Sequence, residues 1–410
     1  MNVKTRFQLS SMMFLEYFVW GAWYVTLNTY LGKSLNFEGS QIGLIYSTNA
    51  IAAMLSPVLV GMVADRFFAS EKVLAVLHIL GAIFIYCTSL VDSFGMVYLF
   101  ILLYNLTFMP TIALTNALSF HQMQDPGKEF PSIRVLGTIG WIVVGLIIGF
   151  MAVEATVVPL RIAAFAALAL GLYSFTLPHT PPQSKGKVSI KEVLGLDALK
   201  LMKNSSFAVL VICSMLLCIP LAFYYNFTNL FLNDSGIEKA AALMTMGQGS
   251  EIIFMLIMPF FFRRLGVKKL IMIAILAWVL RYILFSYGEA GITGWMLLVG
   301  IALHGICYDF FFVTGQIYVD KKANKSIRSS AQGLITFATY GVGMFIGANV
   351  SGLIVNRYSM QLEDVITFDW NKIWLAPAVL SLIIFIIFSL LFKDKVTEKK
   401  TKDKSELATT

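Results

Sequence analysis

Twelve apolar stretches, each close to the length that crosses a lipid bilayer, constrain this chain more than any other feature. A transmembrane helix needs about 20 predominantly apolar residues, and a helix satisfies its backbone hydrogen bonds without water. The stretches lie near residues 9–31, 40–63, 73–91, 95–120, 133–153, 157–177, 206–232, 240–262, 269–288, 292–318, 330–356 and 373–392. Only 13% of the 410 residues are charged, whereas soluble domains have about 25%. The sequence therefore predicts an all-α polytopic membrane protein with 12 transmembrane helices.

The positive charges are divided unevenly between alternate loops. Of the 31 Lys and Arg residues, 25 fall in the two termini and in the loops that would share a side with them. The opposite loops hold Lys33, Arg161, Lys239, Arg357 and Lys372. Cytoplasmic loops carry the excess of Lys and Arg in membrane proteins, so both termini are predicted to be cytoplasmic. The net charge of +8 then reflects topology, and we expect no nucleic-acid binding.

The longest of these cytoplasmic loops, residues 178–205, divides the chain into two parts with equal numbers of predicted helices. We predict six-helix bundles over residues 1–177 and 206–392 with this loop as their linker. That arrangement is the architecture of the major facilitator superfamily. Residues 393–410 are highly charged and poor in apolar residues, so a disordered cytoplasmic tail is predicted there.

The sequence carries none of the motifs by which enzymes bind metals or cofactors. It has no CxxC pair, HExxH helix or glycine-rich phosphate loop. The four cysteines all fall in apolar stretches, where packing explains them. A membrane-embedded transferase would need paired carboxylates or a metal cluster at the membrane surface, and a channel would need rings of like charge. The sequence offers neither, so we expect a carrier without metal or cofactor, and not an enzyme.

Several ionisable side chains fall inside the predicted spans, where each is costly unless it has a partner or a function. Glu16, Glu251 and Asp309 are intramembrane carboxylates. We expect them to bind and release protons or to pair with a cation. Arg281 is expected to snorkel or to form a structural ion pair. His78 lies near the end of a span and suggests no role.

A second group of residues is suited to binding a hydroxylated, ring-containing solute. Spacings of three and four residues place members of one span on one helix face. The candidates are Arg134, Thr138 and Trp141 in the fifth span, Tyr225 and Asn229 in the seventh, Gln248 and Glu251 in the eighth, and His304 and Tyr308 in the tenth. Guanidinium, amide and carboxylate groups bridge hydroxyls, and aromatic faces stack on a base or a sugar. Polar side chains also join transmembrane helices, so packing is an alternative role.

Seven stretches of the chain together resemble the nucleoside:proton symporters of the major facilitator superfamily. They are WGAWYVTLNTYL, FPSIRVLGTIGW, LGLDALKLMKN, QGSEIIFMLIMPFF, AWVLRYILFSYG, CYDFFFVTG and SIRSSAQGL, in this order along nearly the whole chain. The resemblance implies that Arg134 and Thr138 line a nucleoside pocket. It also implies that Gln248 and Glu251 bind ribose and that Asp309 is tied to transport activity.

The chain departs from this family's pattern in several places. Ala222 and Tyr225 stand where the resemblance implies ligand-contacting Gln and Asn, so the preferred base is left open. Glu16 stands where a Gln is expected. The stretch GMVADRFF is similar to the superfamily's gating motif but lacks its later glycine. Its predicted members are Gly61, Asp65 and Arg66.

The leading hypothesis is a proton-coupled nucleoside importer that works by alternating access around a central site between the two halves. Proton coupling is assigned to Asp309, Glu251 and Glu16. The resemblance implies a bacterial inner (cytoplasmic) membrane protein, monomeric and surrounded by lipid, with nucleoside and protons as its partners. The alternative is a transporter of the same fold for another hydroxylated solute, such as a sugar or a muropeptide.

Overall fold

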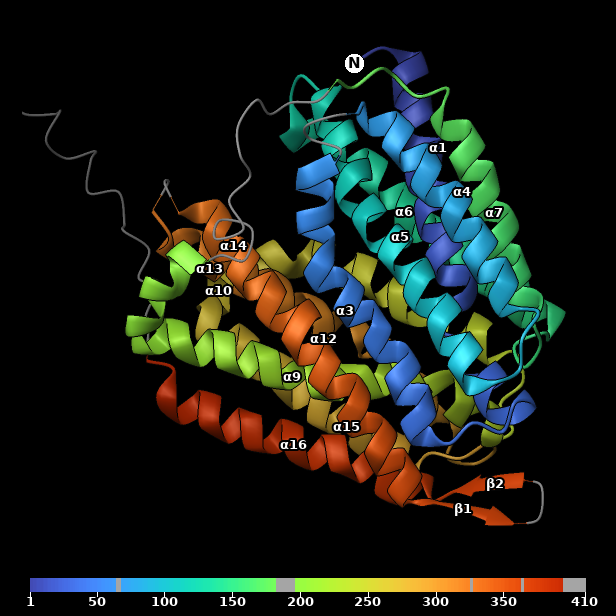
Figure 1. Cartoon of the computed structure of the whole chain (residues 1–410). Coiled ribbons are helices and arrows are strands. Elements are labelled where there is room, and N and C mark those ends of the chain that lie inside the picture. The colour runs from blue at the N-terminus through green and yellow to red at the C-terminus, as the bar shows by residue number, and fades with distance from the viewer. Residues whose placement is uncertain (64–67, 182–195, 325–326, 363–364, 394–410) are drawn as a thin grey trace, which may run out of the picture.

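The structure is a computed structural model that describes residues 1–63, 68–181, 196–324, 327–362 and 365–393. Within these ranges the chain is almost wholly helical (Figure 1). Its helices form two groups that follow the order of the sequence, with the N-terminal group drawn in blue to green and the C-terminal group in yellow-green to red.

The N-terminal half contributes six long helices within the described residues. They are α1 (Val3–Trp23), α3 (Gly39–Val63), α4 (Ser70–Thr88), α5 (Phe94–His121), α6 (Pro126–Met151) and α7 (Val158–Ser174). The short helix α2 (Leu27–Thr29) and the π-helical turn η1 (Tyr30–Ser34) lead from α1 to α3.

The C-terminal half has longer helices that are more often interrupted. Its elements are the 3-10 helix η2 (Leu196–Lys203), α9 (Ser205–Asp234), α10 (Ala240–Tyr287), α11 (Gly294–Ala302), α12 (His304–Tyr308), the π-helical turn η3 (Asp309–Val313), α13 (Thr314–Lys322), α14 (Arg328–Thr336), the π-helical turn η4 (Phe337–Gly343), α15 (Met344–Arg357) and α16 (Trp370–Leu391). Between α15 and α16, strands β1 (Ser359–Leu362) and β2 (Val365–Phe368) form a small antiparallel hairpin. These strands were not predicted from the sequence.

Helix α10 carries two of the predicted membrane passes in one run of helix. Its backbone leaves helical geometry at Gly266 (φ 68°, ψ 177°), a conformation that suits glycine. By length and composition, eight described helices or helix runs can cross a bilayer, and α10 is one of them. With α10 counted as two passes and α1, α3 and α7 added, the described chain makes the twelve predicted passes.

The two halves pack against each other on the side of the molecule that carries the β hairpin, opposite the N-terminus (Figure 1). We call this the hairpin side. Here α3 lies on α15 and α6 lies on α10, with glycines at the contacts. A Cβ at Gly43 would lie 2.4 Å from the Ala348 carbonyl oxygen, and one at Gly149 would lie 2.5 Å from the Ala242 nitrogen. Glycine therefore lets these helices approach more closely than a side chain would allow.

Hydrogen bonds reinforce this packing. Glu154, in the loop after α6, is only 4% exposed. Its carboxylate accepts from the Asn229 and Asn233 amides at 3.0 and 2.6 Å and from the Ala241 backbone N–H at 2.8 Å. Thr29 donates its hydroxyl to Asn229 Oδ1 at 2.6 Å. Every described hydrogen bond between the two halves lies on the hairpin side, so the halves are joined firmly at this side.

Candidate functional site

A cavity of about 470 Å³ lies between the two halves, within the size range of small-molecule sites. Helices α1, α3, α5 and α6 line it from the N-terminal half, and α9, α10, α12, α14, η4 and α15 line it from the C-terminal half. The predicted binding residues that line it are Arg134, Thr138, Trp141, Tyr225, Gln248, Glu251 and Tyr308.

The packed interface lies next to the hairpin side, and the cavity lies beyond it. The order of residues along α6 and α10 shows this arrangement. On α6, Arg134 to Trp141 line the cavity, whereas Gly145 and Gly149 contact α10. On α10 the interface residues around Ala241 come before the cavity residue Gln248. The closed hairpin side therefore forms the floor of the cavity.

Cationic and aromatic groups form the wall from the N-terminal half. The Arg134 guanidinium carbon lies 4.0 Å from the centre of the Tyr17 ring, a cation–π contact that steadies a charge beside the cavity. The Trp141 ring meets the Trp20 ring edge-on, with centroids 5.5 Å apart. Trp20 also lines the cavity. This wall offers a fixed cation next to broad aromatic faces.

The C-terminal half supplies an amide, a carboxylate and three tyrosines. Gln248 and Glu251 stand three residues apart on α10 and both reach the cavity, where the Glu251 side chain is 24% exposed. The Tyr308 hydroxyl forms a hydrogen bond with the Tyr340 hydroxyl. Tyr225 packs against Tyr24 of the other half at 5.8 Å between ring centroids. Polar groups of the C-terminal half therefore face the cation and the aromatic rings of the N-terminal half.

Two predicted binding residues do not line the cavity. Asn229 is fully buried in the interface on the hairpin side, where it bonds Thr29 and Glu154. His304 is fully buried behind the cavity wall, stacked on Tyr224 at 4.9 Å between ring centroids. We therefore no longer assign either residue to direct contact with a solute.

Asp309 is fully buried, and neither of its carboxylate oxygens has a hydrogen-bond partner among the described residues. It begins the π-helical turn η3, directly after the cavity residue Tyr308. Single π-helical turns within helices occur frequently at functional sites. A carboxylate without a partner is very costly in such a place, so Asp309 is the buried acid that most calls for a functional explanation.

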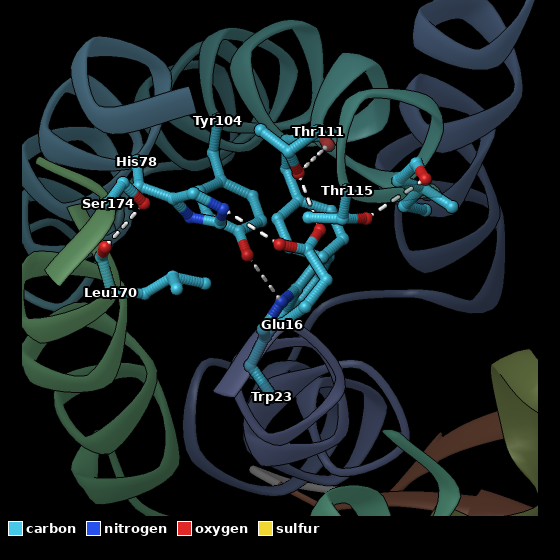
Figure 2. A network of polar contacts seen from close by, with 10 residues as sticks. Glu16, Trp23, His78, Tyr104, Thr111, Thr115, Leu170 and Ser174 are labelled. Atoms are coloured by element: carbon cyan, nitrogen blue, oxygen red, sulfur yellow. Dashed lines mark hydrogen bonds and ion pairs between the residues drawn. The ribbon is translucent and has the colours of Figure 1, made fainter. Parts of the chain in front are cut away.

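Glu16 has a different environment, shown in Figure 2. It is 1% exposed, its Oε2 lies 2.8 Å from His78 Nε2, and its Oε1 accepts the Thr111 hydroxyl hydrogen bond at 2.6 Å. The expectation that His78 has no role is therefore wrong, because it joins α4 to the carboxylate on α1. Sequence patterns do not reveal this pair, since its members are 62 residues apart.

Arg281 does not snorkel. Its side chain is fully buried and bonds the Gly300 carbonyl oxygen and His304 inside the C-terminal half. Of the predicted gating motif, Gly61 lies in the last turn of α3, whereas Asp65 and Arg66 lie outside the described residues. No group of three or more His, Cys, Asp or Glu side chains in the described part of the chain is placed to hold a metal ion.

Two six-helix halves around a central cavity lined by aromatic and polar residues define a transporter with the major facilitator fold. A solved structure of a bacterial homologue of the lysosomal transporter Spinster shares this fold, with a TM-score of 0.73 at 13% identity over 96% of this chain and 98% of that one. The family model described as "Nucleoside H+ symporter" matches residues 1–397. The chain belongs to this family.

Individual relatives match over nearly their whole length. The chain is 45% identical to the putative nucleoside transporter YegT of Escherichia coli (strain K12), over 97% of this chain and 96% of that protein. It is 35% identical to the xanthosine permease of the same organism, over 97% and 98%. The crystal structure of the nucleoside transporter NupG superposes with a TM-score of 0.88 at 35% identity, covering 96% of this chain and 100% of that one.

Proposed function

We propose that this protein carries nucleosides and protons together across the membrane by alternating access. The observation that carries the proposal is the cavity between the halves, where Arg134 faces Gln248 and Glu251 between aromatic walls. Three relatives whose printed names include nucleoside or xanthosine transport support the substrate class. A sugar or a muropeptide remains the alternative solute to be tested.

Substrate contacts follow from the chemistry of the two walls. Gln248 and Glu251 are suited to the vicinal hydroxyls of a ribose, because a carboxylate accepts two hydroxyl hydrogens and an amide both donates and accepts. Trp141, Tyr308 and Tyr225 offer faces on which a base stacks. Ala222 does not face the cavity, since its Cβ packs on α15 near Gly347. We therefore assign base recognition in the seventh span to Tyr225 alone.

Proton coupling is assigned first to Asp309 and Glu251. Asp309 has no partner among the described residues, and Glu251 is the carboxylate exposed to the cavity. A carboxylate that loses its proton in one state and regains it in the other changes the cost of reorienting the carrier. Glu16 already has two hydrogen-bond partners, so we assign it a structural role.

The direction of opening follows from the charge distribution. If both termini are cytoplasmic, the packed hairpin side faces outward and the described state is closed to the outside. In the return step the contacts around Glu154 and the glycines of α3 and α6 would open. We further propose that the protein works as a monomer in a bacterial inner membrane and binds no nucleic acid.

Uptake assays in cells that lack their own nucleoside transporters test the proposal. Labelled uridine, adenosine and xanthosine would be offered with and without a protonophore, with unlabelled maltose or a muropeptide as competitors. We expect uptake of at least one nucleoside that the protonophore abolishes and the competitors do not affect. No nucleoside uptake by protein verified in the membrane, or uptake blocked by a competitor, would refute the substrate class. Uptake that ignores the protonophore would refute coupling.

A further inference from the structure

We propose that Arg281 is a positioning residue for the cavity, acting through His304 to orient Glu251. This inference rests on the proposed function, because it assigns a role within the same site. It concerns three residues that form a line from the interior of the C-terminal half to the cavity: Arg281 on α10, His304 on α12 and Glu251 on α10.

Three contacts fix the Arg281 side chain. Its Nε donates to the Gly300 carbonyl oxygen at 2.9 Å. Its Nη2 lies 3.1 Å from His304 Nδ1. The guanidinium carbon lies 3.8 Å from the centre of the Tyr224 ring, within the range of a cation–π contact. Full burial and these contacts hold the guanidinium against His304.

The contact with Arg281 fixes which nitrogen of His304 carries the proton. A guanidinium is always protonated and has only donors, so His304 Nδ1 must be the acceptor. The neutral imidazole then carries its hydrogen on Nε2. Adding a proton to Nδ1 would set one N–H against another, so His304 stays neutral while this bond lasts. His304 is thereby excluded as the coupling proton's carrier.

The His304 Nε2–H faces the carboxylate of the cavity. His304 Nε2 lies 4.0 Å from Glu251 Oε2 and has no hydrogen-bond partner among the described residues. A shift of about 1 Å would bring these atoms within hydrogen-bond distance. The imidazole ring stacks on Tyr224 and on Tyr308, at 4.9 and 5.9 Å between centroids, and these contacts favour its present orientation. We infer that solute binding closes this gap and that His304 then holds Glu251 against the solute hydroxyls.

The ionisable groups packed around His304 are Arg281 and Glu251 from α10, Tyr224 and Tyr225 from α9, and Tyr308 from its own helix. Removing the cation of Arg281 would leave Nδ1 free to accept a proton and would place a cation beside Glu251. Uptake by such a variant would then depend on pH through the protonation of His304, which stays neutral in the native protein.

The test compares Arg281→Met and Arg281→Lys with Arg263→Met, which removes an exposed arginine from the same helix run. Arg281→Met is expected to raise the nucleoside KM about tenfold, the effect of losing an orienting hydrogen bond, and to add one inflection to the pH profile of uptake. Arg281→Lys keeps a donor-only cation facing Nδ1 and is expected to keep the native pH profile. The double variant Arg281→Met/His304→Gln is expected to lose the added inflection.

Two outcomes would overturn the inference. In the first, Arg281→Met lowers Vmax or protein yield while KM and the pH profile match those of the native protein, which is the behaviour of a purely structural arginine. In the second, the added inflection survives in the double variant, so that it does not come from His304. Nucleoside binding by the native protein is measured first. If the native protein does not bind nucleoside, the proposed function is wrong. If it binds nucleoside but the variants give either of these two outcomes, only the role proposed for Arg281 is wrong.

Discussion

The two halves of the molecule each bury a carboxylate in the membrane-spanning region, and they treat it differently. In the N-terminal half, Glu16 is bonded by His78 and Thr111. In the C-terminal half, Asp309 has no hydrogen-bond partner among the described residues. A buried carboxylate is costly unless its oxygens have hydrogen-bond partners, so the two sites stabilise their carboxylates differently. Burial of a carboxylate alone therefore does not identify a proton carrier, because the hydrogen-bond partners of the carboxylate determine its role.

The largest effect is expected from Asp309→Asn, which imitates the permanently protonated acid. Accumulation of nucleoside driven by a proton gradient should fall by about tenfold or more, because the carrier loses the group that exchanges the proton. Exchange of labelled for unlabelled nucleoside at equal concentrations should survive, since it needs no net proton movement. Uptake rates with an imposed gradient and exchange rates without one, measured on the same vesicles, check this. Equal loss of both activities would show that Asp309 is structural.

Glu251→Gln is expected to weaken substrate binding as well as proton coupling. The change removes a charged acceptor of the solute hydroxyls, and hydrogen bonds to charged groups contribute enough for an increase in nucleoside KM of about tenfold. The matched control is Glu238→Gln, an exposed carboxylate in the loop before α10. Binding of nucleoside to the purified protein measures the effect. An unchanged affinity would move ribose recognition away from Glu251.

Glu154 is a third buried carboxylate. Its hydrogen bonds join the two halves, whereas the hydrogen bonds of Glu16 lie within one half. Glu154→Gln removes the charge that attracts two amides and the start of α10, so the hairpin side should open more often. A cysteine placed at Thr245, in a background without the four native cysteines, should react about tenfold faster with an impermeant thiol reagent. Glu38→Gln, an exposed carboxylate on the same side, is the control. An unchanged labelling rate would show that the glycine contacts alone hold this side closed.

The smallest effect on transport is expected at Glu16. Glu16→Gln keeps an acceptor for the Thr111 hydroxyl and offers an amide N–H to His78 Nε2, which accepts in the other imidazole tautomer, so proton-driven uptake should stay within about threefold of the native rate. The cost should fall on stability, and a double-mutant cycle with His78→Gln should give a coupling of about 1–3 kcal/mol in unfolding free energy. Uptake lost as completely as in Asp309→Asn would remove the distinction between the two halves.

The sequence predicted the fold well because each transmembrane helix is a local feature. A run of apolar residues identifies a span without knowledge of its neighbours, and the break at Gly266 falls between two predicted spans. The cavity residues Arg134, Thr138 and Trp141 were found in the same way, since spacing along one helix defines a face. The β hairpin was missed because its strands are too short to stand out from a loop.

Partners on other helices could not be predicted from such patterns. Asn229 follows Tyr225 by one helical turn and shares its face, yet that one turn moves it from the cavity into the closed interface. His304 lies one turn before Tyr308 but points behind the wall toward Arg281. Spacing along a helix gives the direction of a side chain, whereas the depth at which two halves meet depends on packing across the whole molecule.

The most direct test of the account measures proton movement in proteoliposomes that contain the native protein, Asp309→Asn or Glu16→Gln and a pH-sensitive dye in the lumen. Nucleoside is added outside, with the membrane potential clamped. We expect lumenal acidification for the native protein and for Glu16→Gln, and none for Asp309→Asn. Acidification that persists in Asp309→Asn and disappears in Glu16→Gln would contradict this expectation and would move the coupling proton to the N-terminal half.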